Sequence, residues 1–349
     1  MFKRLLIGNL EIKYPIVQGG MAVGISLDGL ASAVANAGGI GVIGTAGIGF
    51  FSELKNYKEA SIDGLKKIIR KAKEKSNGVI GVNIMVALTN YGDMVKTAID
   101  ENIDIIFSGA GLPLNLPSFL NNKKKTKLVP IVSSLKAAQI IVKRWLSKYN
   151  YLPDAFVLEG PLAGGHLGYK DNELFLEKNN LENNIPKLKD FLDNLEHNYG
   201  KKIPLIAGGG LYSKDDVERI LSLGADAVQI GTRFIATEEC DANIKFKEVI
   251  INAKDEDIAI IKSPVGLPGR AIRNEFIEAV DKGEKKPYEC KYHCIKTCDF
   301  KTAPYCIAKA LYNAAIGNIN EGFVFTGNAV SKINEIQKVE DIIKELFES

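Results

Sequence analysis

The sequence is short of several features that would place it in a common class of protein. Its formal net charge is only +3, and its basic residues are spread along the chain, so it gives no indication of nucleic-acid binding. The amino-terminal residues include no apolar stretch long enough for a secretion signal, which favours a cytoplasmic protein. Histidine and cysteine are also scarce, with three and five residues.

One uncharged stretch, residues 29–51, has the length of a membrane-spanning helix. Seven of its residues are glycine, and the NAGG sequence at residues 36–39 predicts a break into a helix and a short strand. We therefore expect no membrane association. The one tight basic run, residues 121–127, is expected to be a solvated turn, with docking of an acidic group as the alternative.

Eight short apolar runs alternate with helical stretches over about two thirds of the chain. They begin at or near Ile16, Ile40, Val79, Ile103, Leu128, Ala155, Pro204 and Ala227. Runs this apolar are typical of strands buried on both faces, and the amphipathic stretches between them supply crossover helices, so the sheet should be parallel. Eight such units predict an α/β fold of the (β/α)8 TIM barrel type, with an open doubly wound sheet as the alternative.

The barrel repeat stops after Phe234. We therefore predict a barrel over residues 1–234 and a helical C-terminal region over residues 235–349, which carries the cysteine cluster, shows no clear strand spacing and packs on the barrel. Polar and glycine-rich residues follow the predicted strands consistently. This favours the barrel over the open sheet, because barrel active sites form at the carboxyl ends of the strands.

The loops after the seventh and eighth strands carry small residues suited to a phosphate. Gly208, Gly209 and Gly210 follow the seventh strand, and Gly231 and Thr232 follow the eighth. In TIM barrels these two loops commonly bind phosphate, because backbone N–H groups converge there and glycine allows a close approach. The pattern predicts a phosphorylated cofactor, with simple tight turns as the alternative.

Two earlier strands carry further candidates. The first ends in QGGM, where Gly19 and Gly20 would let a flat ring lie against the backbone and Met21 would supply an apolar contact. A plain strand-to-helix turn explains the same residues. Asn83 is polar within an apolar strand and needs a hydrogen-bond partner if it is buried. A flavin edge or an internal water would each provide one.

These pieces together resemble the flavin-dependent nitronate monooxygenases, formerly called 2-nitropropane dioxygenases, and their relatives, the FMN-dependent enoyl-ACP reductases. The matching segments are spread in order over residues 14–275. They are PIVQGGM, LASAVANAGGIGVIG, GVNIMV, SGAG, EGPLAGGHLG, PLIAGGG, GADAVQIGTRF and SPVGLPGRAIRN.

The resemblance implies noncovalently bound FMN. Its phosphate would lie near Gly209, Gly210, Gly231 and Thr232, and its ring against Gly19, Gly20 and Met21, with Asn83 and Glu159 as polar contacts. Gly164 and Gly165 would bring a loop close to the flavin, leaving His166 over its reactive face as the catalytic base, a role that suits an imidazole near neutral pH. An ordinary barrel-mouth carboxylate is the alternative for Glu159, and a histidine in a surface turn is the alternative for His166. Arg270 and Arg273 would either close the pocket around an anionic substrate or form structural ion pairs.

Two enzymatic functions follow from the resemblance. The first is oxidation of alkyl nitronates with O2 to a carbonyl compound and nitrite. The second is a reductase that passes hydride from NAD(P)H through FMN to an enoyl thioester or quinone. A flavin-carrying sensor or electron-transfer protein is a third hypothesis. The partners expected are a small-molecule substrate and, from the resemblance, a second copy of the chain in a homodimer.

The cysteine distribution departs from the pattern of that family. Cys290, Cys294, Cys298 and Cys306 fall within 17 residues, and only Cys240 lies elsewhere. Without a secretion signal a disulfide framework is disfavoured. If the segment is helical, the spacing places the first three thiols on one side, as a metal or iron-sulfur site would need. Buried free thiols or a redox-sensitive pair are the alternatives.

Overall fold

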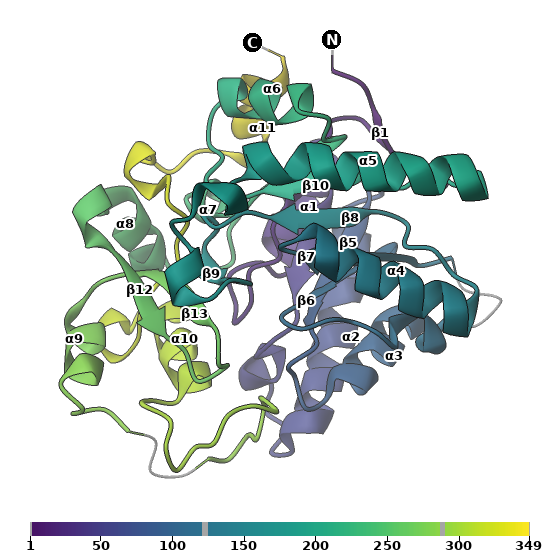
Figure 1. The fold of residues 1–349 in the computed structure, drawn as a ribbon. Coiled ribbons are helices and arrows are strands. Elements are labelled where there is room, and N and C mark those ends of the chain that lie inside the picture. The colour runs from purple at the N-terminus through teal and green to yellow at the C-terminus, as the bar shows by residue number, and fades with distance from the viewer. Residues whose placement is uncertain (1, 121–124, 287–289, 349) are drawn as a thin grey trace.

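The computed structural model describes residues 2–120, 125–286 and 290–348. Eight parallel strands form its central sheet (Figure 1). They are β3 (Ile16–Gln18), β4 (Gly41–Gly44), β5 (Ile80–Met85), β6 (Ile105–Gly109), β7 (Lys127–Val132), β8 (Phe156–Glu159), β10 (Leu205–Gly208) and β11 (Ala227–Ile230). Their order is β3-β11-β10-β8-β7-β6-β5-β4, and a parallel bridge between Val17 and Ile40 joins the two end strands. The predicted TIM barrel is confirmed.

Helices connect successive strands of the barrel. They are α1 (Asp28–Asn36), α2 (Tyr57–Lys75), α3 (Tyr91–Asp100), α4 (Leu135–Tyr149), α5 (Leu181–Tyr199) and α6 (Lys214–Ser222), with α7 (Thr232–Ile235) and α8 (Ile244–Asn252) following the last strand. In its described residues, the crossover from β6 to β7 has only a short 3-10 helix, η2 (Leu116–Phe119). Local signals set helix ends: Ser134 caps α4 by accepting a hydrogen bond from the Ala137 amide, and Gly200 ends α5 with a φ of 66°.

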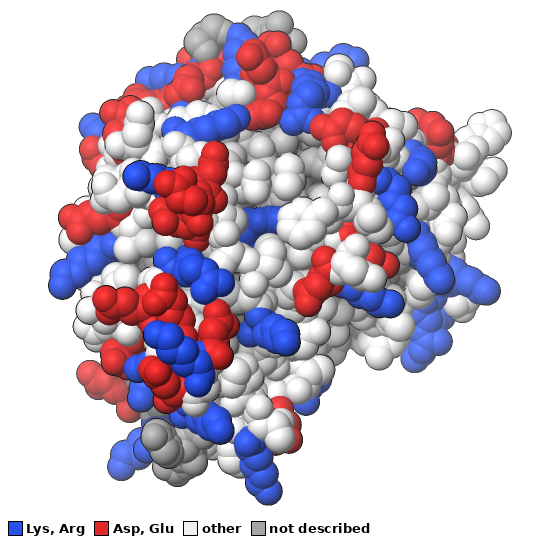
Figure 2. Space-filling model, turned by 60° about the vertical axis from the view of Figure 1, so that its left-hand side comes forward, with Lys and Arg blue, Asp and Glu red and all other residues white. Residues whose placement is uncertain are grey.

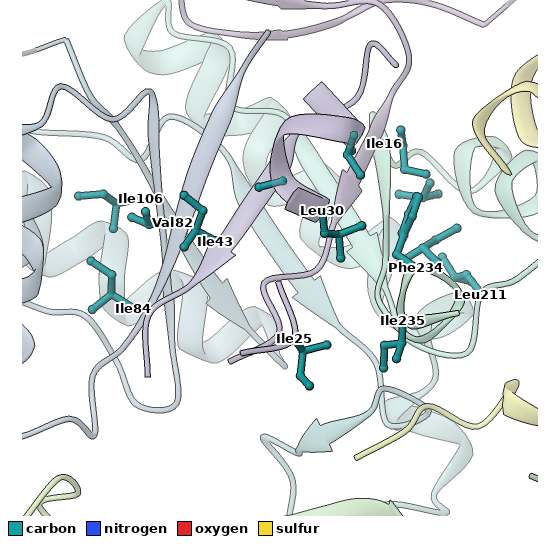
Figure 3. Close-up of a cluster of buried hydrophobic side chains, with 14 of the residues drawn as sticks. Ile16, Ile25, Leu30, Ile43, Val82, Ile84, Ile106, Leu211, Phe234 and Ile235 are labelled. Atoms are coloured by element: carbon teal, nitrogen blue, oxygen red, sulfur yellow. The ribbon is translucent and has the colours of Figure 1, made fainter. Parts of the chain in front are cut away.

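The barrel strands are buried on both faces, which explains why they read as continuous apolar runs. Val42 and Phe107 belong to a cluster inside the barrel, whereas their neighbours Ile43 and Ile106 belong to the cluster between strands and helices. Figure 3 shows part of this outer cluster, in which Leu30 of α1 lies between strand residues such as Ile16 and Ile43.

An antiparallel hairpin precedes the barrel and was not predicted from the sequence. Its strands are β1 (Leu5–Ile7) and β2 (Leu10–Ile12). Leu5, Ile7 and Ile12 are buried in the same cluster as the inward-facing barrel residues. The hairpin therefore contributes to the barrel interior.

The region after residue 234 contains helices, as predicted, and also two strands that the sequence analysis did not identify. It contains α9 (Glu275–Asp281), α10 (Ile307–Ala315) and α11 (Val339–Phe347), but also β12 (Ile258–Lys262) and β13 (Pro268–Ile272). These two strands pair antiparallel, and β13 also pairs with the two-residue strand β9 (Gly165–His166) from the barrel loop. The pairing of β9 with β13 joins residues about 100 apart in sequence, which local periodicity does not reveal.

None of the helices in the described residues is both long and apolar enough to span a membrane. On the face shown in Figure 2, basic and acidic side chains are interspersed. Residues 121–124, the larger part of the tight basic run, lie outside the described residues.

Candidate active site

A cavity of about 640 Å³ lies at the carboxyl ends of the barrel strands. The last residues of β4, β6, β8 and β10 all line it, together with residues of the loop that carries β9. Its size falls in the usual range for cofactor and small-molecule sites, and its position is that of TIM-barrel active sites. Every candidate site residue predicted for the barrel lines this one cavity: Gly19, Gly20, Met21, Asn83, Glu159, Gly164, Gly165, His166, Gly208, Gly209, Gly210, Gly231 and Thr232.

The wall formed by the first and third predicted strands is closely packed. Asn83 donates a hydrogen bond from Nδ2 to the carbonyl oxygen of Gly20 at 3.2 Å. A Cβ atom at position 20 would lie 2.4 Å from the Cβ of Asn83 and 2.9 Å from Val42. Glycine is therefore required at this position, because any larger residue would displace Asn83 from the cavity wall.

The opposite end of the cavity presents unpaired backbone donors. Gly209 and Gly210 have φ angles of 124° and 75°, and neither amide donates a hydrogen bond to any residue in the described chain. The same holds for the Gly231 amide. Thr232 Oγ1 accepts a hydrogen bond from the Gly327 amide at 2.8 Å. Such exposed N–H groups in glycine-rich turns suit the oxygens of a phosphate.

His166 is held at the cavity by residues from the C-terminal region. Its Nε2 lies 2.7 Å from Ser263 Oγ, and its ring packs edge-on against Phe325 at 5.0 Å between centroids. Its backbone pairs with Gly269 of β13. Gly165 before it has a φ of 73°, a conformation that glycine adopts without strain. The imidazole is thus positioned by a strand pair, a hydroxyl and an aromatic ring.

Burial lowers the pKa of His166 to about 4. The imidazole is therefore neutral at neutral pH and has one unprotonated ring nitrogen. The Ser263 hydroxyl itself accepts a hydrogen bond from the Val265 amide at 3.2 Å, and its proton has no other acceptor than His166 in the described residues. We infer from this that the hydroxyl donates to Nε2, which places the ring proton on Nδ1.

Glu159 is a second titratable group in the cavity, at the end of β8. Burial raises the pKa of its carboxyl group to about 7. Its side chain accepts no hydrogen bond from the residues that the structure describes, whereas its carbonyl oxygen accepts one from the Tyr169 hydroxyl at 2.8 Å. The carboxyl group is thus close to half protonated at neutral pH.

The two candidate arginines occupy structural positions. Arg270 is buried and donates from Nη1 to the carbonyl oxygens of Pro161 and Ala163, at 2.7 and 2.5 Å, so it holds the loop that carries His166. Burial lowers the pKa of its guanidinium group. Arg273 forms an ion pair with Asp281 at 3.2 Å. Arg273 thus forms the structural ion pair stated as the alternative, whereas Arg270 forms no ion pair with the described residues and holds the loop through backbone carbonyl oxygens instead.

The sequence pattern that defines the family described as nitronate monooxygenase matches residues 3–100 and 89–349, nearly the whole chain. The chain belongs to the nitronate monooxygenase family. A relative named probable nitronate monooxygenase, from Staphylococcus aureus strain Newman, is 28% identical over 317 residues, covering 81% of each chain. Membership of this family makes the chain an oxidoreductase.

Two solved structures resemble this nitronate monooxygenase family member over most of its length. FabK from Thermotoga maritima superimposes with a TM-score of 0.74 at 27% identity, covering 97% of this chain and 92% of that one. The nitroalkane oxidase from Streptomyces ansochromogenes has a TM-score of 0.72 at 18% identity, covering 96% and 95%. The second likeness concerns the fold alone.

Several residues in or beside the cavity of this chain were not predicted as site residues. Ser263 and Phe325 contact His166, and Gln229 and Arg233 line the cavity from the eighth strand and the helix after it. Ser263 begins the SPVGLPGRAIRN segment, so the matching segment marked the region without indicating which residue contacts the histidine. Phe325 lies in no segment that the sequence analysis singled out.

The cysteine segment is not helical, so its spacing does not place the first three thiols on one side of a helix. Residues 290–305 form turns and extended chain, and α10 begins only after Cys306. The segment pairs with the loop after β5 through an antiparallel bridge between Leu88 and Ile295. All five cysteines of the chain are free thiols.

Proposed function

We propose that the chain is an FMN-dependent nitronate monooxygenase that oxidises alkyl nitronates with O2 to a carbonyl compound and nitrite. The observation that carries this proposal is a neutral imidazole, His166, in a cavity large enough for a cofactor and a small substrate. Family membership and the nitronate monooxygenase relatives support the reaction class.

Two independent features of the cavity suit FMN. The unpaired amides of Gly209, Gly210 and Gly231 are suitable donors for phosphate oxygens. Arg233 lines the same cavity, and its Nε is buried without a hydrogen-bond partner in the described chain, so an anion bound there has a further donor to satisfy. At the other end, Gly20 and Asn83 form a wall that a larger residue would disrupt. When bound, FMN supplies the oxidation of the substrate carbon and the reaction with O2.

The low pKa of His166 favours a substrate that is already deprotonated. A base with a pKa of about 4 is weak, so abstracting a proton from carbon is slow for this histidine in the absence of other charges. A nitronate needs no such abstraction. Its negative charge next to the imidazole instead favours the protonated ring, so His166 takes up a proton and pairs with the anion.

For a neutral nitroalkane, His166 must act as the base. The base form is the other tautomer, in which the ring proton lies on Nε2 and is donated to Ser263 Oγ, so that Nδ1 accepts the proton from the carbon beside the nitro group. Imidazolium and nitronate then form together as an ion pair. Nitroalkanes are therefore expected to be slower substrates than their nitronates.

The decisive test compares two substrates in the wild-type protein and in His166→Ala. In the wild type, an alkyl nitronate should reduce the bound flavin anaerobically, and aerobic turnover should release nitrite. His166→Ala should keep its flavin, lose turnover of the neutral nitroalkane by about 100-fold or more, and retain more of its nitronate turnover. His197→Ala, which changes an exposed histidine of α5, is the matched control and should behave as wild type.

Two results would contradict the proposal. A protein that binds no flavin excludes it outright. A flavin that is reduced rapidly by NADH or NADPH but not by the nitronate would instead assign the reductase activity expected of an enoyl-ACP reductase.

A further inference from the structure

Four of the five cysteines gather around a second, smaller cavity that adjoins the main one. Cys290, Cys294, Cys298 and Cys306 all line it, and His293, Phe300 and Tyr305 complete much of its wall. Cys294 lines the main cavity as well. The fifth cysteine, Cys240, is buried elsewhere and donates a hydrogen bond to the carbonyl oxygen of Ile25.

The loop that carries these cysteines is fixed to the barrel. The Thr89 amide donates to the carbonyl oxygen of Cys294 at 3.1 Å, and the Lys296 amide donates to that of Ala87 at 2.9 Å. Thr297 Oγ1 donates to the carbonyl oxygen of Val265 at 2.8 Å. A segment with little regular secondary structure is thus held by contacts on both sides, and the thiols are brought together by the fold.

Two of the sulfurs lie beside backbone groups that suit a metal ligand. The His293 amide donates to Cys290 Sγ at 3.4 Å, and His293 adopts a φ of 43°, which is uncommon for a residue other than glycine. Cys306 is the N-cap residue of α10, a nine-residue helix, where the helix dipole stabilises negative charge. Amide hydrogen bonds to cysteine sulfur are also one of the features that tune iron-sulfur clusters.

All four thiols line the same small cavity. Four mutually repelling thiolates are stabilised when they share a cationic centre, because metal coordination deprotonates thiols.

We propose that Cys290, Cys294, Cys298 and Cys306 are the ligands of a four-iron iron-sulfur cluster. A set of four sulfur donors is typical of either zinc or an iron-sulfur cluster. Around one zinc ion, Zn–S bonds of about 2.3 Å would require the sulfurs to converge closely. In the described part of the chain no three His, Cys, Asp or Glu side chains converge in a way that could hold a single metal ion. A cluster has ligand sulfurs that stand farther apart, on the outside of a larger inorganic core.

The cluster would share a wall with the main cavity, because Cys294 lines both. The proposal does not depend on which reaction takes place in that cavity, since it concerns only the metal content of the cysteine loop.

The test is metal and sulfide analysis of the full-length protein, purified anaerobically and reconstituted with ferrous iron and sulfide. We expect about four iron and four sulfide per chain, with an electron paramagnetic resonance signal after reduction by dithionite. Cys298→Ala and Cys306→Ala should each lower the iron content several-fold and abolish the signal. Cys240→Ser changes the one cysteine outside the cluster and should retain both.

Three outcomes would overturn the proposal. One is wild-type protein that contains no iron after reconstitution. Another is one tightly bound zinc per chain in place of iron, and the third is a cluster that persists in both cysteine-to-alanine variants. If a variant fails to fold, as judged by circular dichroism, the iron and sulfide content of the wild type still decides the question.

Discussion

The direction of the hydrogen bond between Ser263 and His166 determines whether removal of the Ser263 hydroxyl raises or lowers the pKa of His166. Ser263→Ala deletes the hydroxyl group that lies 2.7 Å from Nε2. Because the hydroxyl donates to the unprotonated nitrogen, the bond stabilises the neutral imidazole, and its loss favours protonation. The pKa should therefore rise from about 4 toward the ordinary value of 6.5.

The size of this shift follows from the energy of one hydrogen bond. A net contribution of about 0.5–1.5 kcal/mol corresponds to about 0.4–1.1 pKa units. The chain has only three histidines, so nuclear magnetic resonance of ring-labelled histidine can follow each titration, with His197→Ala assigning one signal. Tyr305→Phe is the control, because it removes a hydroxyl that donates to the carbonyl oxygen of Lys262 beside Ser263 without contacting His166.

A lower pKa in Ser263→Ala than in the wild type would refute this reasoning. It would mean that the hydroxyl accepts a hydrogen bond from Nε2, that the ring proton lies on Nε2 and that Nδ1 is the free base. An unchanged pKa would show that burial alone sets the neutral form of His166.

Two further predictions concern the cavity walls. Gly20→Ala should lower the free energy of unfolding by about 1–3 kcal/mol and weaken flavin retention, because its methyl group overlaps Asn83. Thermal unfolding and flavin release check this prediction. Glu159→Gln should stabilise the flavin-free protein above pH 7 by up to about 3 kcal/mol. Burial raises the pKa of Glu159 from 4.5 to about 7 on folding. The wild type therefore loses stability as the pH rises through that window, whereas the glutamine variant does not. Equal stability of the wild type and Glu159→Gln in urea at pH 8 would contradict the second prediction.

The barrel could be predicted because its signals are local. Each strand is a short apolar run, buried inside by residues such as Val42 and outside by residues such as Ile43, and polar or glycine residues mark its carboxyl end. The closure of the sheet through Val17 and Ile40 follows from eight consecutive units of this kind. The glycines of the cavity could be located for the same reason, since they directly follow strands.

The small sheet of β9, β12 and β13 could not be predicted in this way. β9 has two residues, too few for any periodicity, and it becomes a strand only because β13 lies beside it. The cysteine loop is a related case. Its spacing suggested a helical face, whereas the fold brings the thiols together through contacts with the loop after β5.

The state of His166 shows why this missing part matters for function. The sequence around it, AGGH, locates the residue and its flexible neighbours, but the groups that set its ionisation lie far along the chain. Ser263 is 97 residues away and Phe325 lies beyond β13. These contacts come from the region after the barrel, and they help to orient and bury the imidazole, whose burial lowers its pKa. Whether the site works on a nitronate or must first deprotonate a nitroalkane therefore depends on the C-terminal region as much as on the barrel loop that carries the histidine.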